Sequence, residues 1–105
     1  MPCFVITGAS EGIGAELARQ LAHTHQSQAQ LVLAARTAAN LASVAQACRE
    51  AQAQVLVVPT DVSDPAQCRA LIEQAVRQFG GIDALINNAG VSAHALFSDV
   101  RSEDL

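Results

Sequence analysis

The stretch VITGASEGIG, residues 5–14, limits the fold of this chain more than any other feature. An apolar run stops at Gly8, a short polar segment follows, and Gly12 and Gly14 open a helical pattern. Glycines at this spacing permit a tight turn, a close approach of backbone N–H groups to a phosphate, and close packing of the helix on the sheet. The amino end of the helix adds unpaired donors and partial positive charge. The stretch therefore predicts a phosphate-binding turn, with a flexible surface turn as the alternative.

A phosphate loop of the NTPase kind is excluded. Its motif ends in a Lys that reaches the phosphates, and this chain contains no Lys.

Four short apolar runs predict β-strands. They cover Cys3–Thr7, Gln30–Ala35, Gln54–Pro59 and residues 82–87. The runs are nearly continuous rather than alternating, which is typical of strands buried on both faces of a parallel sheet.

Three apolar stripes at helical spacing lie between these strands. The stripes are Ile13, Leu17 and Leu21; then Leu41, Val44, Ala45 and Cys48; and finally Cys68, Leu71, Ile72, Ala75, Val76 and Phe79. Ser63 or Asp64 is expected to cap the third helix, with Pro65 in its first turn and the pair Gly80–Gly81 beyond its end.

The alternation of strands and helices predicts an α/β fold, a doubly wound parallel sheet of the Rossmann type. The expected strand order is 3-2-1-4, with the first two helices on one face and the third helix on the other. Ligands bind such sheets where the order reverses, between the first and fourth strands. The glycine turn lies at that point.

Composition excludes several other classes of protein. The 105 residues are half apolar with a net charge of −4, and the six Arg are scattered, so nucleic acid is not expected as a partner. No apolar run approaches the roughly 20 residues of a membrane span. The three cysteines, Cys3, Cys48 and Cys68, lack any CxxC spacing, so we expect them to be small core residues rather than metal ligands. Such cysteines are typical of a reducing compartment, which favours a cytoplasmic location.

The end of the second strand bears on the choice of cofactor. NAD-binding folds usually carry an acid there for the ribose hydroxyls, whereas this chain has Ala35 and Arg36. A guanidinium can pair with a 2′-phosphate, which favours NADP. A solvated Arg36 at a strand end is the alternative. Glu11 adds negative charge inside the turn, so NAD stays open.

Together the segments TGASEGIG, Asp61–Val62 and NNAG (87–90) resemble the short-chain dehydrogenase/reductase family. The resemblance runs from residue 3 to the end of the chain. It implies a pyrophosphate and adenosine-ribose loop formed by Gly8, Ser10, Gly12, Ile13 and Gly14.

The same resemblance implies roles for six further residues. Arg36 matches the basic position of NADP-preferring members, and Asp61, with Val62 beside it, matches the acid that contacts the adenine amino group. Asn88, Ala89 and Gly90 match the segment beside the nicotinamide ribose. Asn87 is expected to bond between strands.

In the family, hydride passes between the nicotinamide and a small-molecule carbonyl or alcohol substrate. A Tyr acts as general acid and base, assisted by a Lys, and the family places both beyond residue 105. This chain has neither residue type, so no catalytic residue is assigned. His94, Ser92 and Ser98 show no orienting partner.

The sequence also predicts a fold cut before its catalytic half. Ser102 is a candidate N-terminal cap, and Glu103 and Asp104 would lie in the first turn of a helix that the last residue, Leu105, leaves incomplete. We therefore expect residues 1–105 to be a partial NAD(P)-binding domain that is inactive alone and homo-oligomeric when complete.

Two other functions remain open. One is a non-catalytic nucleotide-binding or interaction module. The other is an S-adenosylmethionine-dependent methyltransferase, which Arg36 and NNAG disfavour.

Overall fold

The computed structural model describes residues 1–88. Its strands are β1 (Cys3–Thr7), β2 (Gln30–Ala35), β3 (Gln54–Pro59) and β4 (Ala84–Ile86). Its helices are α1 (Gly12–His25), α2 (Ala38–Glu50) and α3 (Pro65–Phe79), with a short 3₁₀ turn η1 (Gln26–Gln28) after α1. The bounds predicted for the first three strands are confirmed, whereas the fourth is shorter than the expected 82–87. Within this part of the chain, no helix combines the length and the apolar character needed to cross a membrane.

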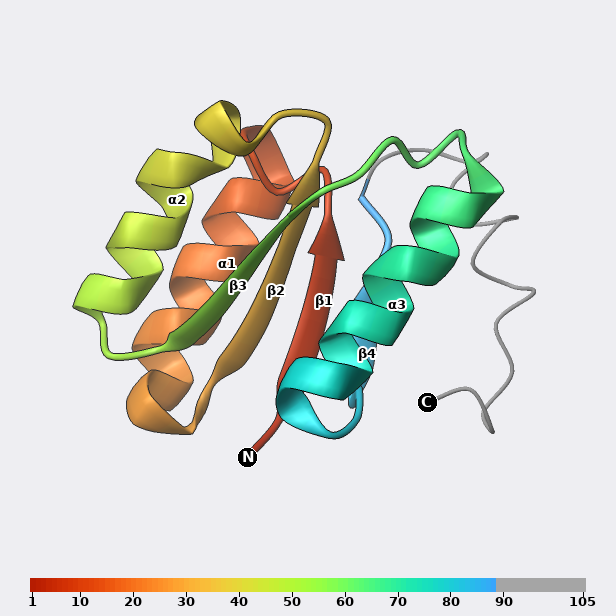
Figure 1. Ribbon diagram of the computed structural model, residues 1–105. Helices are drawn as coiled ribbons and strands as arrows, with labels where there is room; N and C mark the ends of the chain where they lie inside the picture. Colours follow the sequence, from red (N-terminus) through yellow and green to blue (C-terminus); the bar gives the residue numbers. More distant parts are fainter. Residues whose placement is uncertain (89–105) are drawn as a thin grey trace.

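The strands form one parallel sheet in the order β3-β2-β1-β4 (Figure 1). β1 is central, and its Ile6 pairs with Leu33 of β2 on one side and with Ile86 of β4 on the other. The predicted order 3-2-1-4 is therefore confirmed. The carboxyl end of β1 lies where the order reverses.

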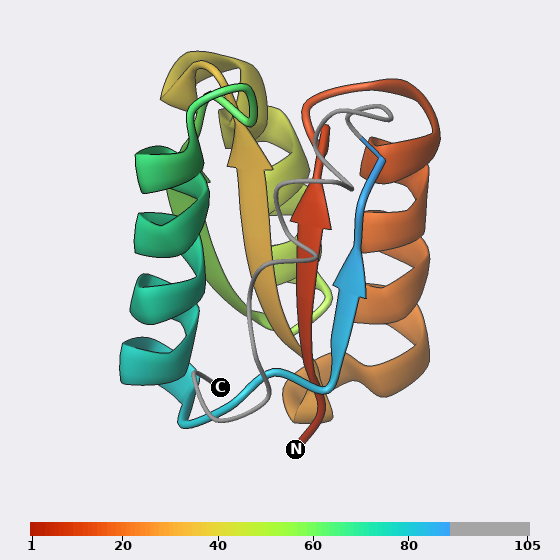
Figure 2. The same cartoon turned by 90° about the vertical axis from the view of Figure 1, so that its right-hand side faces the viewer.

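Helices cover both faces of the sheet, with α1 and α2 on one face and α3 on the other (Figures 1 and 2). Successive residues of a strand point to opposite faces. Accordingly Ile6 and Leu33 pack with α1 and α2, whereas Val5 and Val32 pack with α3. The predicted placement of the helices is confirmed.

The core-facing side of α1 differs from the predicted stripe. Ile13 is 78% exposed, and Leu17 and Leu21 are only partly buried. The buried residues of α1 are Gly14, Ala15, Ala18 and Ala22. Small side chains bring this helix close to β1 and to the turn after it, whereas a row of Leu and Ile would hold it away. The predicted stripe is therefore only partly right: Leu21 packs against the core, whereas Ile13 is exposed, because the prediction followed the largest apolar residues.

The stripes of α2 and α3 are as expected. All four residues of the second stripe are buried in α2. In α3 the buried residues are Cys68, Leu71, Ile72 and Ala75, and Val76 and Phe79 are partly buried.

Both ends of α3 have the residues that the sequence predicts. Asp64 is the cap, accepting a hydrogen bond from the backbone N of Ala66 at 3.0 Å, and Pro65 is the first helical residue. Gly80 ends the helix in the left-handed conformation, with φ of +85°. These ends determine where the chain leaves β3 and where it turns toward β4.

Candidate functional site

The carboxyl ends of β1, β2 and β3 surround a pocket of about 360 Å³. Its lining residues are Gly8, Ser10, Ala35, Arg36, Thr37, Asn40, Thr60 and Val62. Parallel strands bring the residues that follow them to the same edge of the sheet. The pocket combines hydroxyl, amide and guanidinium groups with small apolar side chains, a mixture suited to a nucleoside.

The glycine turn brings β1, the start of α1 and the end of β4 into contact. Gly8 has φ of +62°, a conformation that favours glycine. A Cβ on Gly14 would stand 2.8 Å from Nδ2 of Asn88 and closer still to the carbonyl oxygen of Gly8. Glycine at position 14 therefore allows the helix to approach the turn.

The amino end of α1 is open to a ligand. Glu11 is the N-terminal cap residue, but its side chain accepts no hydrogen bond from the helix. A Cβ on Gly12 would meet no atom within 4 Å among the described residues. Unpaired N–H groups at a helix start bind anions, so this end fits a pyrophosphate.

A buried hydroxyl connects β1 to the residues after β4. Oγ1 of Thr7 donates to Oδ1 of Asn87 at 3.2 Å and accepts from the backbone N of Asn88 at 3.0 Å. Nδ2 of Asn88 donates to the carbonyl oxygen of Gly8 at 3.4 Å. Asn87 thus forms the bond between strands that the sequence predicts, and Asn88 is held beside the glycine turn.

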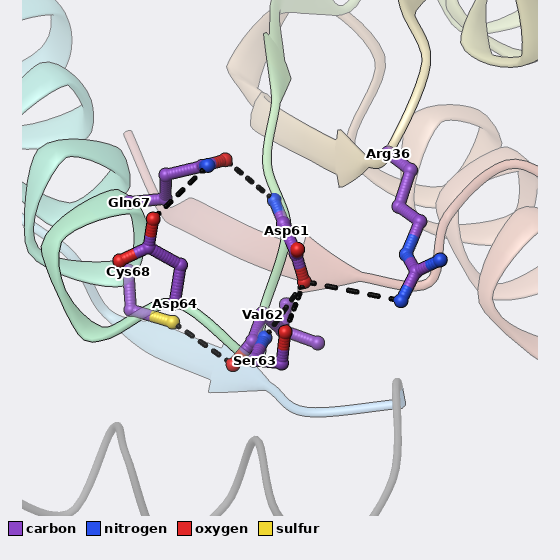
Figure 3. Close-up of polar contacts among 7 residues, drawn as sticks. All are labelled: Arg36, Asp61, Val62, Ser63, Asp64, Gln67 and Cys68. Carbon is purple, nitrogen blue, oxygen red and sulfur yellow. Dashed lines mark hydrogen bonds and ion pairs between the residues drawn. The ribbon is translucent and has the colours of Figure 1, made fainter.

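Arg36 and Asp61 form a loose ion pair at the ends of β2 and β3 (Figure 3). Nη2 of Arg36 lies 4.0 Å from Oδ1 of Asp61, and the two side chains are 81% and 40% exposed. Exposed pairs contribute about 0–1 kcal/mol. A phosphate could therefore recruit the guanidinium at little loss.

Hydrogen bonds from the next turn hold the carboxylate of Asp61. Ser63 donates to Oδ1 from its hydroxyl at 2.6 Å and from its backbone N at 3.0 Å. These bonds, with the hydroxyl first and with a smaller contribution from Arg36, lower the pKa of Asp61. The group is therefore an anion at neutral pH and a hydrogen-bond acceptor only.

Glu11 lines a second hollow, of about 390 Å³, which shares Ser10 and Asn40 with the pocket at the strand ends. Ala39 and Ser43 of α2 complete its lining. The exposed residue Glu11 therefore lines a hollow that adjoins the pocket lined by Arg36.

The structure gathers the predicted site residues along one edge of the sheet. Four of them line the pocket at the strand ends, namely Gly8, Ser10, Arg36 and Val62. Asp61 is not a lining residue, but it lies between two that are. The other described residues lie beside the pocket: Gly12, Ile13 and Gly14 are at the start of α1, and Asn88 follows β4. Ala89 and Gly90 lie outside the described residues, as do Ser92, His94 and Ser98.

Three lining residues were missed by the sequence analysis, namely Thr37, Asn40 and Thr60. Thr37 is the cap residue of α2, and its Oγ1 accepts a hydrogen bond from Nδ2 of Asn40 at 2.8 Å. Their positions in the sequence could have indicated them, because each residue lies shortly after a strand that ends at the site.

Residues 1–88 contain no cluster of three His, Cys, Asp or Glu side chains that could hold a metal ion. Cys3, Cys48 and Cys68 are buried and unpaired.

A family model described as short chain dehydrogenase matches residues 2–105. Sepiapterin reductase of Chlorobaculum tepidum is 40% identical over 104 residues, which cover 95% of this chain and 43% of that protein. 11-beta-hydroxysteroid dehydrogenase A of Sesamum indicum is 42% identical over 98 residues, covering 92% of this chain and 27% of that protein. The chain thus spans less than half the length of each relative.

Several solved structures have a similar fold. A short-chain type dehydrogenase/reductase from Mycobacterium marinum superposes with a TM-score of 0.79 at 36% identity, over 86% of this chain and 35% of that one. L-sorbose reductase of Gluconobacter frateurii, complexed with NADPH and L-sorbose, gives 0.78 at 38% identity over 86% and 34%. An NADH-dependent reductase complexed with NAD gives 0.75 at 35% identity over 86% and 36%.

Proposed function

Because the chain belongs to the short-chain dehydrogenase family, we propose that it is the NADP(H)-binding part of an oxidoreductase. The whole protein would transfer hydride between the nicotinamide and a small-molecule carbonyl or alcohol substrate. The observation that carries this proposal is the exposed guanidinium of Arg36 at the edge of the pocket. No carboxylate occupies the end of β2, where NAD-binding folds usually keep one.

Each part of the site has a role in this proposal. The amino end of α1, with Gly8, Ser10, Gly12, Ile13 and Gly14, would bind the pyrophosphate and the adenosine ribose. Hydrogen bonds from backbone N–H groups and the partial positive charge of the helix stabilise such an anion.

The adenosine 2′-phosphate would lie against Arg36. A guanidinium offers paired donors in a geometry that matches a phosphate. Asp61 would accept a hydrogen bond from the adenine amino group, with Val62 beside the ring. Asn88, Ala89 and Gly90 would lie beside the nicotinamide ribose.

Similar structures do not decide between the two cofactors, since one contains NADPH and another NAD. Glu11 opposes a further anion near the pocket, but its carboxylate is exposed and therefore screened. Arg36 carries the preference because it lines the pocket directly. NAD is accordingly the weaker ligand in this proposal.

The catalytic step needs residues that these 105 residues do not supply. The sequence has no Tyr and no Lys, the pair that the family uses for proton transfer. We therefore propose that this chain alone binds the cofactor without reducing a carbonyl compound.

A non-catalytic nucleotide-binding module is the second candidate, because the pocket at the strand ends accounts for nucleotide binding alone. The coding sequence of the whole protein discriminates between the two. A Tyr followed four residues later by a Lys supports the oxidoreductase.

The proposal extends to compartment and assembly. Three buried, unpaired cysteines suit a reducing cytoplasm. A homo-oligomer rests on the family resemblance alone, and light scattering of the whole protein tests it.

Binding of cofactor to the whole protein tests the central claim. We expect NADPH to bind at least tenfold more tightly than NADH in fluorescence or calorimetric titrations. Equal affinities, or tighter binding of NADH, would contradict the NADP(H) proposal. Failure of both to bind would contradict the nucleotide site itself.

A further inference from the structure

The turn between β3 and α3 holds Asp61 in one orientation (Figure 3). Both hydrogen bonds to its carboxylate end on Oδ1, and the Arg36 guanidinium faces the same oxygen. Within residues 1–88 no side chain or backbone donor bonds to Oδ2. One carboxylate oxygen is thus held by the protein, and the other accepts no hydrogen bond from the described residues.

A second set of bonds holds the backbone of the same turn. The backbone N of Asp61 donates to Oε1 of Gln67 at 2.7 Å, and Nε2 of Gln67 donates to Oδ2 of Asp64 at 3.2 Å. Asp64 in turn caps α3. The position of Asp61 is therefore tied to a helix, whereas the direction of its carboxylate depends on Ser63.

We infer that Ser63 is a positioning residue for adenine recognition. Its hydroxyl and backbone N hold Oδ1 of Asp61 so that Oδ2 accepts a hydrogen bond from the exocyclic amino group of the base. This inference rests on the proposed function, because it takes NADP(H) as the ligand of the pocket. It assigns a role to a residue that would not itself touch the cofactor.

The chemistry of Asp61 explains what such positioning achieves. An ionised carboxylate accepts hydrogen bonds and donates none. It therefore favours an amino group at position 6 of the purine over a carbonyl oxygen, which would place two acceptors together. A carboxylate free to rotate can turn toward water or Arg36, and discrimination between the two bases then falls.

The test compares NADPH with its hypoxanthine analogue, in which a carbonyl replaces the 6-amino group. In the whole protein we expect wild type to bind NADPH about tenfold more tightly than the analogue, as for a hydrogen bond to a charged group. Ser63→Ala should reduce this ratio to about threefold or less. Ser63→Thr keeps the hydroxyl and should restore it. Ser27→Ala, an exposed serine in η1, is the matched control and should leave the ratio unchanged.

The ratio separates positioning from a structural role. A variant that only loosens the start of α3 would weaken the binding of NADPH and of its hypoxanthine analogue equally, and the ratio of the two affinities would stay near tenfold. In an Asp61→Asn background, Ser63→Ala should have no further effect on the ratio, because the two residues act as a pair.

The inference is overturned if Ser63→Ala binds NADPH and keeps the wild-type ratio of affinities. It is also overturned if wild type binds NADPH and its hypoxanthine analogue equally tightly. If wild type binds NADH but not NADPH, the NADP(H) assignment fails. The ratio measured with NADH and its own hypoxanthine analogue then decides the role of Ser63 separately.

Discussion

Arg36 and Asp61, 25 positions apart in the sequence, come within 4.0 Å of each other at the ends of neighbouring strands. The pair places a cation in the lining of the proposed adenosine pocket and an anion next to that cation. A 2′-phosphate would be attracted by one group and an adenine amino group by the other. The two charges therefore act on different parts of one ligand, and each can be tested separately.

Replacing Arg36 with Asp should reverse the cofactor preference of the whole protein. The change removes the cation and introduces a carboxylate able to accept from ribose hydroxyls. We expect NADPH affinity to fall about ten- to hundredfold, as for charge-assisted hydrogen bonds, while NADH affinity holds or rises. Titrations with both cofactors measure the ratio. Arg77→Asp in the last turn of α3 is the control for net charge, and an unchanged ratio in Arg36→Asp would remove Arg36 from the site.

Replacing Glu11 with Gln should tighten NADPH binding about two- to fivefold, as for an exposed charge. The carboxylate lines the hollow beside the pocket and opposes an anionic ligand. The gain should shrink as salt concentration rises, because salt screens exposed charges. Glu73→Gln on the exposed surface of α3 is the matched control. A gain of the same size in both variants would show a general effect of net charge.

Among the glycines of residues 1–88, Gly14 should tolerate replacement by alanine least. A Cβ there would lie within 3 Å of Nδ2 of Asn88 and of the Gly8 carbonyl. We expect Gly14→Ala to lower the free energy of unfolding by about 1–3 kcal/mol, as overpacking does. Gly81→Ala, where a Cβ would meet no atom of residues 1–88 within 4 Å, should be near neutral. Urea unfolding of the whole protein compares them, and equal losses would mean that the close contact does not determine stability.

Replacing Thr7 with Val keeps the volume of the side chain and removes its hydroxyl. The backbone N of Asn88 and Oδ1 of Asn87 then lose their partner, so stability should fall by about 1–3 kcal/mol. Amide exchange at Asn88 should accelerate in Thr7→Val but not in Thr7→Ser, which retains the hydroxyl. Protection of Asn88 that is unchanged in Thr7→Val would contradict the assigned bond.

Alkaline pH should destabilise the fold partly through Cys3. Burial, followed by the charge of Asp83, raises the pKa of its thiol from 9.0 to about 11. The folded state thus holds the proton more tightly than the unfolded state. This contribution to stability is complete below pH 9 and is lost as pH rises through about 11.

Denaturation at a series of pH values, with wild type and Cys3→Ala compared, measures the contribution of Cys3. The free energy of unfolding of Cys3→Ala should fall less steeply with rising pH than that of wild type. Part of the fall should remain, because burial also raises the pKa values of Cys48 and Cys68. Identical slopes would exclude Cys3.

Much of the fold could be predicted because its signals are local. The apolar runs, the cap at Asp64 and the glycine spacing each act over a few residues. Right-handed crossovers, together with a glycine turn after the first strand, then favour the doubly wound order 3-2-1-4. Gly8, Ser10, Arg36 and Val62 could be placed near one another for the same reason, since each lies at or just beyond the end of a parallel strand.

The tertiary structure alone decided the buried face of α1 and the partners of the charged and polar groups. Ile13 is exposed because Gly14 and Ala18, not the larger residues, let that helix approach the sheet. The bonds of Thr7 to Asn87 and Asn88 and the meeting of Arg36 with Asp61 join residues distant in sequence. Local patterns predict where a chain bends, but which groups meet depends on how closely its helices and strands pack.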